Sequence, residues 1–85
     1  MGESGRDVAV ITTRQVLEGA PVLIVERSDG TWQFVCGTTN NTTDGRVVGL
    51  NEILAIDPRL NEPVERSRSG GVARRPHVGA AWHYR

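Results

Sequence analysis

The dipeptide Asp29-Gly30 is the feature that most narrows the folds open to this chain. It lies between two runs rich in β-branched and aromatic residues, one over 21–27 and one over 31–37. A type I′ turn needs positive φ at both central positions, and Asp-Gly is one of the pairs that adopt this conformation most readily. The sequence therefore predicts a β-hairpin with a two-residue turn and strands over 21–27 and 31–37.

A two-residue turn also fixes which residues of the hairpin lie opposite one another. One face then holds the pairs Arg27 with Trp32, Val25 with Phe34 and Leu23 with Cys36, and the other holds Glu26 with Gln33, Ile24 with Val35 and Val22 with Gly37. The first face carries the large rings, and a slip of one residue would turn them to the opposite side. We therefore assign the first face to the core.

Two further strands and a short helix are expected around the hairpin. Residues 7–12 and 46–49 are short and rich in β-branched side chains, as expected of strands. Residues 13–18 have the features of a short helix, because Thr12 and Gln15 have the spacing of a capping box.

A second helix is predicted over 50–57, where apolar residues recur at helical spacing. It has to end by Asp57, because Pro58 disfavours helical backbone in the residue before it. The predicted fold is α+β, a small antiparallel sheet covered by this helix. The predicted core is Leu23, Val25, Trp32, Phe34, Cys36, Leu50, Ile53 and Leu54.

Charge is unevenly distributed along the 85 residues, although the formal net charge is zero. Residues 1–61 hold eight carboxylates and five arginines, a net charge of −3, whereas residues 62–85 hold two carboxylates and five arginines, a net charge of +3. The second segment is rich in Gly, Ser and Pro, as disordered segments are. We therefore predict a single α+β domain over 1–61 and a basic tail over 62–85, with Trp82 as its candidate anchor on the sheet.

Size and composition exclude several classes of protein. A chain this short supports one thin core and leaves little room for a deep active-site cleft. The single Cys36 excludes an internal disulfide, and with two histidines it gives no structural zinc site. No run approaches the ~18 apolar residues of a membrane span, and residues 1–7 lack the apolar stretch of a signal peptide. We expect a cytoplasmic protein with no cofactor, no metal and no membrane partner.

No group of residues in the sequence combines a nucleophile, a base and an orienting group. Cys36 is the only thiol, and its partners would be His77 or His83. The predicted register buries Cys36, and a buried free cysteine usually behaves as a small hydrophobic residue. We therefore expect that the protein is not an enzyme.

One cluster of arginines in the tail could bind a nucleic acid, a small anionic ligand or an acidic protein surface. It consists of Arg66, Arg68, Arg74 and Arg75. Three features argue against nucleic acid: the zero net charge, the absence of aromatic residues among these arginines, and the acidic character of residues 1–61. Solvation of the tail and contact with a protein remain the other two interpretations.

The order and spacing of four motifs resemble a family of small bacterial proteins. These motifs are Val10-Ile11-x-x-Arg14-x-Val16-Leu17-Glu18-Gly19, Asp29-Gly30-x-Trp32-x-Phe34-x-x-Gly37, Asp44-Gly45-x-Val47-Val48-x-Leu50-x-x-Ile53 and Asp57-Pro58-x-Leu60. That family, first described as a domain of unknown function, is grouped with the immunity proteins of polymorphic toxin systems. The resemblance covers about residues 8–61, and it implies no catalysis, no cofactor and a toxin domain as the partner.

Together these inferences predict a non-enzymatic bacterial protein-binding module that blocks a protein toxin. The candidate partner-binding surface is the polar loop 38–46 together with an exposed sheet edge, because loops on a rigid sheet are free to vary for recognition. The candidate residues are Asn40, Asn41, Asp44 and Arg46. The alternative is a small-ligand or nucleic-acid-binding domain that uses the arginine-rich tail.

Overall fold

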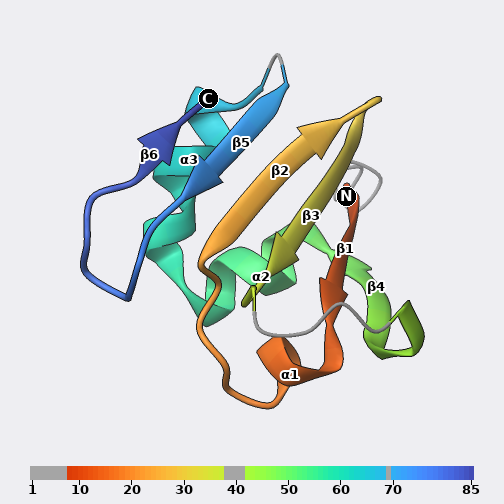
Figure 1. Cartoon of the computed structure of the whole chain (residues 1–85). Coiled ribbons are helices and arrows are strands. Elements are labelled where there is room, and N and C mark those ends of the chain that lie inside the picture. Colours follow the sequence, from red (N-terminus) through yellow and green to blue (C-terminus); the bar gives the residue numbers. More distant parts are fainter. Residues whose placement is uncertain (1–7, 38–41, 69) are drawn as a thin grey trace.

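The chain folds around one six-stranded sheet (Figure 1). Four of its strands correspond to the predicted ones, and two further strands in the C-terminal segment were not predicted. The computed structural model describes residues 8–37, 42–68 and 70–85. Its elements in chain order are β1 (Ala9–Thr13), α1 (Arg14–Leu17), β2 (Ile24–Ser28), β3 (Thr31–Val35), η2 (Thr42–Asp44), β4 (Gly45–Gly49), α2 (Leu50–Ile56), η3 (Pro58–Leu60), α3 (Asn61–Arg66), β5 (Gly71–Arg74) and β6 (His83–Tyr84). The predicted α+β class is confirmed.

The hairpin of β2 and β3 has the predicted register. Its pairs include Val25 with Phe34 and Arg27 with Trp32. Asp29 and Gly30 have φ of 53° and 79°, the left-handed conformation that a type I′ turn requires at both positions. The turn chemistry therefore decides the register, and the register carries both rings to the same face.

The sheet is mixed, so the prediction of an antiparallel sheet was wrong in one respect. The strand order is β4-β1-β3-β2-β5-β6, and β1 pairs with β3 in parallel. After β1 the chain reverses through α1 and places β2 two positions away in the sheet, and the hairpin then places β3 between β2 and β1. The parallel pair thus follows from a tight hairpin that is inserted next to an earlier strand.

Helix α1 begins one residue later than the capping box predicts. The cap is Thr13, whose side chain accepts a hydrogen bond from the backbone N–H of Val16. Thr12 is fully buried instead, and its hydroxyl donates to the carbonyl oxygen of Phe34 at 2.7 Å. The predicted capping role of Thr12 is therefore wrong, because the hydroxyl serves the contact between β1 and β3.

The helices α2 and α3 lie on one face of the sheet, and the core fills the space between them and the sheet (Figure 1). Of the predicted core residues, Leu50 and Leu54 are partly buried and pack against the core, and the fully buried ones are Val25, Trp32, Phe34, Cys36 and Ile53. Leu23 is only half-buried and lies outside the core. It precedes β2, and its N–H donates to the carbonyl of Val35, so the chain leaves the predicted pairing with Cys36 at this point.

The predicted boundary after residue 61 does not divide the structure. Strand β5 pairs with β2 on one side and with β6 on the other, so residues 71–74 lie inside the sheet. Ala73 is fully buried, and Trp82 has an exposed fraction of 9%. Residues 62–85 are therefore part of the same domain, with Trp82 packed into its core rather than tethering a separate tail.

Candidate functional site

Three connections between elements converge on Arg75. They are residues 18–23 between α1 and β2, residues 57–60 between α2 and α3, and residues 75–82 between β5 and β6, and we call them together the loop cluster. Arg75 donates from Nε and Nη2 to the carbonyl oxygen of Val22, at 3.1 and 2.9 Å. Its Nη2 also donates to Oδ2 of Asp57 at 3.0 Å. One side chain thus joins three segments that are far apart in the sequence.

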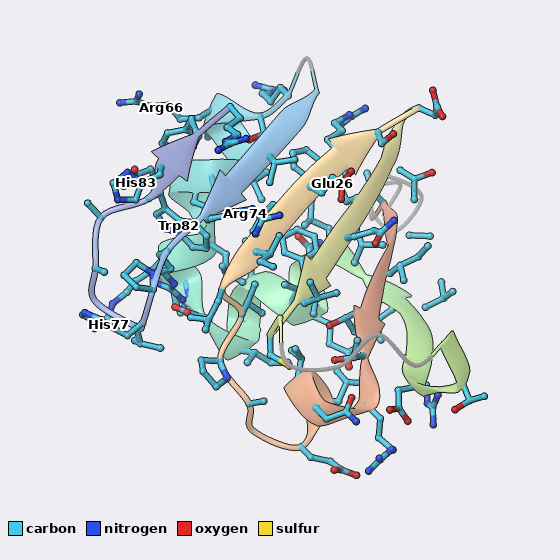
Figure 2. All side chains as sticks on the ribbon, viewed as in Figure 1. Glu26, Arg66, Arg74, His77, Trp82 and His83 are labelled. Carbon is cyan, nitrogen blue, oxygen red and sulfur yellow. The ribbon has the colours of Figure 1, made fainter. Side chains whose placement is uncertain are left out.

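The Arg75 guanidinium is buried, with a side-chain exposure of 1%, whereas Asp57 is 22% exposed. A buried charge is tolerated only when it is paired and hydrogen-bonded, and Arg75 meets both conditions. Its Cζ also lies over the ring of Trp82, 4.4 Å from the centroid. These contacts hold the connection between β5 and β6, which carries His77 and Trp82 in Figure 2, against the rest of the fold.

Asp57 has a second structural role in the same place. Its Oδ1 accepts a hydrogen bond from the backbone N–H of Arg59 at 3.0 Å, which caps η3. Pro58 occupies the first position of that turn, where the missing N–H has no cost. The carboxylate therefore fixes the path of residues 57–60 and, through Arg75, ties them to the other two connections.

A tight turn places Val78 at the outer end of the loop cluster. The N–H of Ala80 donates to the carbonyl oxygen of His77 at 3.2 Å. Gly79 has φ of 92°, which a type II turn requires at its third position and which glycine adopts without strain. The turn leaves Val78 at its corner with an exposed fraction of 44%.

Three grooves border the loop cluster. The largest, about 630 Å³, is lined by η3 and by residues 79–82. A second, about 320 Å³, is lined by residues 19–22 together with Ile56 and Val78. The third groove, about 390 Å³, is lined by Arg75 together with Leu23 and Cys36. Each groove is lined by Arg75 or by one of the residues to which it bonds.

The loop cluster and the adjoining end of α2 combine exposed apolar side chains with Arg59, a cation that forms no ion pair with any residue the structure describes. Ile56 has an exposed fraction of 49%, close to that of Val78. Arg59 is exposed and lines both the 630 Å³ and the 320 Å³ groove. Exposed aliphatic groups on well-fixed loops are typical of surfaces that bind another molecule.

The predicted partner-binding residues lie outside the loop cluster, and two of them, Asp44 and Arg46, form hydrogen bonds within the fold. Asn40 and Asn41 lie outside the described residues. Asp44 accepts hydrogen bonds from Gln15 at 2.8 Å and from Arg14 at 3.3 Å, which ties η2 to α1. The hydrogen bond from Gln15 and the charge of Arg14 hold the pKa of Asp44 below its usual value. Arg46 donates to two backbone carbonyls nearby, those of residues 43 and 45.

The predicted sheet edge is present at β4, which is the terminal strand next to β1. Val47 on this strand has an exposed fraction of 72%, the largest among the exposed apolar residues of the described chain. An exposed edge strand of this kind can accept a partner by strand addition. The edge therefore remains a second surface for comparison with the loop cluster.

The arginines predicted as one cluster are divided among different environments. Arg75 is buried, Arg68 pairs with Glu65 at 3.2 Å, and Arg66 lies over the ring of Tyr84. Arg74 is exposed on β5, apart from Arg66 at the end of α3 (Figure 2). A phosphate backbone is bound by several cations on one surface, and the burial of Arg75 removes one of these four side chains from the surface.

The residues considered for catalysis and metal binding are also separated. Cys36 is buried, whereas His77 and His83 are exposed on the connection between β5 and β6 and on β6 itself. Within residues 8–37, 42–68 and 70–85, no three His, Cys, Asp or Glu side chains gather in a way that could hold a metal ion. In the same part of the chain, every helix is too short or too polar to cross a membrane.

Comparison of the chain with models of protein families, with curated proteins and with solved structures finds no match in any of the three.

Sequence reasoning missed the loop cluster because its centre is an arginine, which a sequence alone assigns to the surface. The sequence contains one indication that these three connections are ordered. Three of the four prolines, Pro21, Pro58 and Pro76, lie one in each of the three connections. Proline restricts the backbone of a loop, so prolines in three separate connections indicate that these connections have defined conformations.

Proposed function

We propose that the protein is a non-enzymatic bacterial protein-binding module that acts in the cytoplasm and blocks a toxin domain, as the resemblance to immunity proteins implies. The observation that supports this best is the loop cluster, in which the buried Arg75 holds three connections in fixed positions beside exposed aliphatic side chains. A surface that is already ordered loses little conformational entropy on binding, which favours affinity.

A protein partner explains this surface better than a nucleic acid does. Interfaces between proteins have an apolar centre with a polar rim, and the loop cluster offers Val78 beside Arg59, next to Ile56 at the end of α2. Nucleic-acid affinity instead depends on clustered cations. Arg66, Arg68 and Arg75 already interact with groups of their own chain.

The experiment that tests the proposal uses the product of an adjacent toxin-like gene. The purified toxin domain and the full-length protein are mixed, and binding is measured by calorimetry together with the residual toxic activity. We expect tight binding, a loss of toxicity and little dependence on salt, because a packed interface is screened less than phosphate contacts are.

Matched valine variants locate the surface. Val78→Arg places a charge on the loop cluster, and Val47→Arg places the same charge on the β4 edge; both residues are exposed, so neither change should disturb the core. We expect Val78→Arg alone to abolish binding. Loss of binding in Val47→Arg alone would assign the partner to the sheet edge instead. The proposal would be overturned if the protein bound DNA in a strongly salt-dependent manner and did not bind the toxin domain.

A further inference from the structure

We infer that the loop cluster binds a segment of the partner in which an acidic residue lies between aliphatic residues, with the carboxylate at Arg59 and an aliphatic side chain against Ile56 and Val78. This inference rests on the proposed function, because it specifies the chemistry of the partner at the same site.

Arg59 is the cation of the loop cluster that lacks an internal partner. It is exposed, and its guanidinium forms no ion pair or hydrogen bond with any described residue. The carboxylates on either side already have donors: Asp57 accepts from Arg75, and Glu62 accepts from the Tyr84 hydroxyl at 2.8 Å. A carboxylate supplied from outside can therefore form a direct ion pair with Arg59, although Glu62 keeps its negative charge because its donor is neutral.

The apolar half of the site lies in the 320 Å³ groove. Ile56 from the end of α2 and Val78 from the turn at 77–80 both line it, together with Arg59. An aliphatic side chain that enters the groove removes apolar surface of both residues from water. Since Arg59 lines the same groove, the carboxylate that binds it has to be close in sequence to that aliphatic side chain.

The neighbouring groove allows the segment to continue past Arg59. The small or apolar part of its lining is Pro58, Gly79, Ala80, Ala81 and Trp82, and its charged part is Arg59, Glu62 and Arg75. A second aliphatic residue after the acidic one fits this environment. The two grooves share Arg59, which therefore lies between the aliphatic side chains of one groove and the small and apolar side chains of the other, and selects the charge between them.

The test uses a capped peptide of sequence Gly-Ser-Leu-Glu-Leu-Ser-Gly and the same peptide with Gln in place of Glu. Each is titrated into the full-length 15N-labelled protein, and amide shifts are followed by NMR. We expect shifts at residues 56–59 and 78–82, and an affinity for the Glu peptide about two- to fivefold higher, the range that an exposed ion pair gives.

Substitutions identify the groups that bind. Arg59→Gln should remove the preference for Glu over Gln, whereas Arg74→Gln, which removes another exposed arginine outside these two grooves, should leave it unchanged. Val78→Asn should weaken both peptides about equally, and Val47→Asn should weaken neither.

Three results would overturn the inference: no shifts in the loop cluster, equal binding of the Glu and Gln peptides, or a short oligothymidylate that shifts the same amides more strongly than the Glu peptide. If the toxin domain still binds and Val78→Arg still abolishes this binding, the proposed function holds and only the inferred chemistry of the partner fails. If the toxin domain does not bind, the proposed function fails whatever the peptides do.

Discussion

The Arg75 guanidinium lies 3.0 Å from the carboxylate of Asp57 and also donates two hydrogen bonds to the carbonyl oxygen of Val22. These partners are 18 and 53 residues away in the chain. The contact therefore closes long stretches of chain around one buried charge. It adds to the backbone hydrogen bond from the N–H of Arg75 to the carbonyl oxygen of Leu23, at 3.0 Å, which joins two of the three segments, and it ties the third segment to them through Asp57.

Arg75→Met should destabilise the protein strongly. It leaves the Val22 carbonyl and the Asp57 carboxylate without their donor, and removal of one partner of a buried ion pair typically costs about 3 kcal/mol or more. Total stability of a domain of this size is on the order of 4–13 kcal/mol, so the loss is a large share. Urea unfolding followed by tryptophan fluorescence measures it.

Arg68→Met is the control for that variant. Arg68 and Glu65 form an ion pair whose side chains are 73% and 67% exposed. Exposed pairs contribute little, so the free energy of unfolding should change by less than about 0.5 kcal/mol. Equal urea midpoints for Arg75→Met and Arg68→Met would mean that Arg75 does not hold the loop cluster together.

A chain that ends at residue 66 should not fold. It lacks β5, which pairs with β2, and it lacks the buried side chains of Ala73 and Trp82. Loss of an inner strand exposes the edge of β2 and opens the core, which a domain with so little buried surface cannot sustain. Far-UV circular dichroism and the dispersion of amide NMR signals report the result. A cooperative thermal transition in the shortened chain would restore the predicted division after residue 61.

Local chemistry explains which parts of the fold the sequence predicts. The hairpin register follows from Asp29-Gly30 and from the alternation of Val25 with its neighbours, and both signals lie within a few residues of one another. The end of α2 follows in the same way from Pro58. These are short-range effects, and the structure retains them.

Long-range pairing explains what the sequence could not predict. Strand β5 is four residues long and has one fully buried side chain, Ala73, so its sequence shows no alternation. Its place is set by pairing with β2, and the burial of Arg75 is set by Val22 and Asp57. An arginine between an arginine and a proline carries no local sign of such partners, and the candidate site could therefore not be found from the sequence.

Thr12 and Thr13 should respond differently to loss of the hydroxyl, although they are adjacent. Thr12→Val removes the buried hydrogen bond to the Phe34 carbonyl and should cost about 1–2 kcal/mol, whereas Thr12→Ser keeps the donor and should cost less. Thr13→Ala removes the helix cap and should cost about 1 kcal/mol, and Thr13→Ser should be tolerated. Thermal unfolding compares the four variants. If Thr12→Val is neutral, the hydroxyl has no role in holding β1 against β3.

Asp44 should contribute to stability at neutral pH and lose this contribution in acid. Its pKa in the folded protein is lowered by the hydrogen bond from Gln15 and by the charge of Arg14. A lowered pKa favours folding above the unfolded-state pKa of about 4, and the contribution disappears as pH falls through the lower folded value. The melting temperatures of wild type and Asp44→Asn should therefore converge as pH falls from about 6 to about 2. Parallel curves across that range would exclude this role for Asp44.

Tyr84 should ionise at unusually high pH, and the measurement is direct because it is the single tyrosine of the chain. Burial and the hydrogen bond to Glu62 raise its pKa to about 12. A raised pKa stabilises the folded state below the unfolded value of about 10, and this stabilisation is lost as pH rises through about 12. Tyrosinate absorbance in a pH titration gives the midpoint.

Two variants on α3 separate the causes of that shift. Glu62→Ala removes the acceptor and the negative charge next to the Tyr84 hydroxyl, so the midpoint should move down toward the ordinary tyrosine value while part of the shift from burial remains. Glu65→Ala removes an equal charge that pairs with Arg68 instead, and it should leave the midpoint in place. A midpoint near 10 in the folded wild-type protein would mean that β6 does not pack against α3 as the contact between Tyr84 and Glu62 requires.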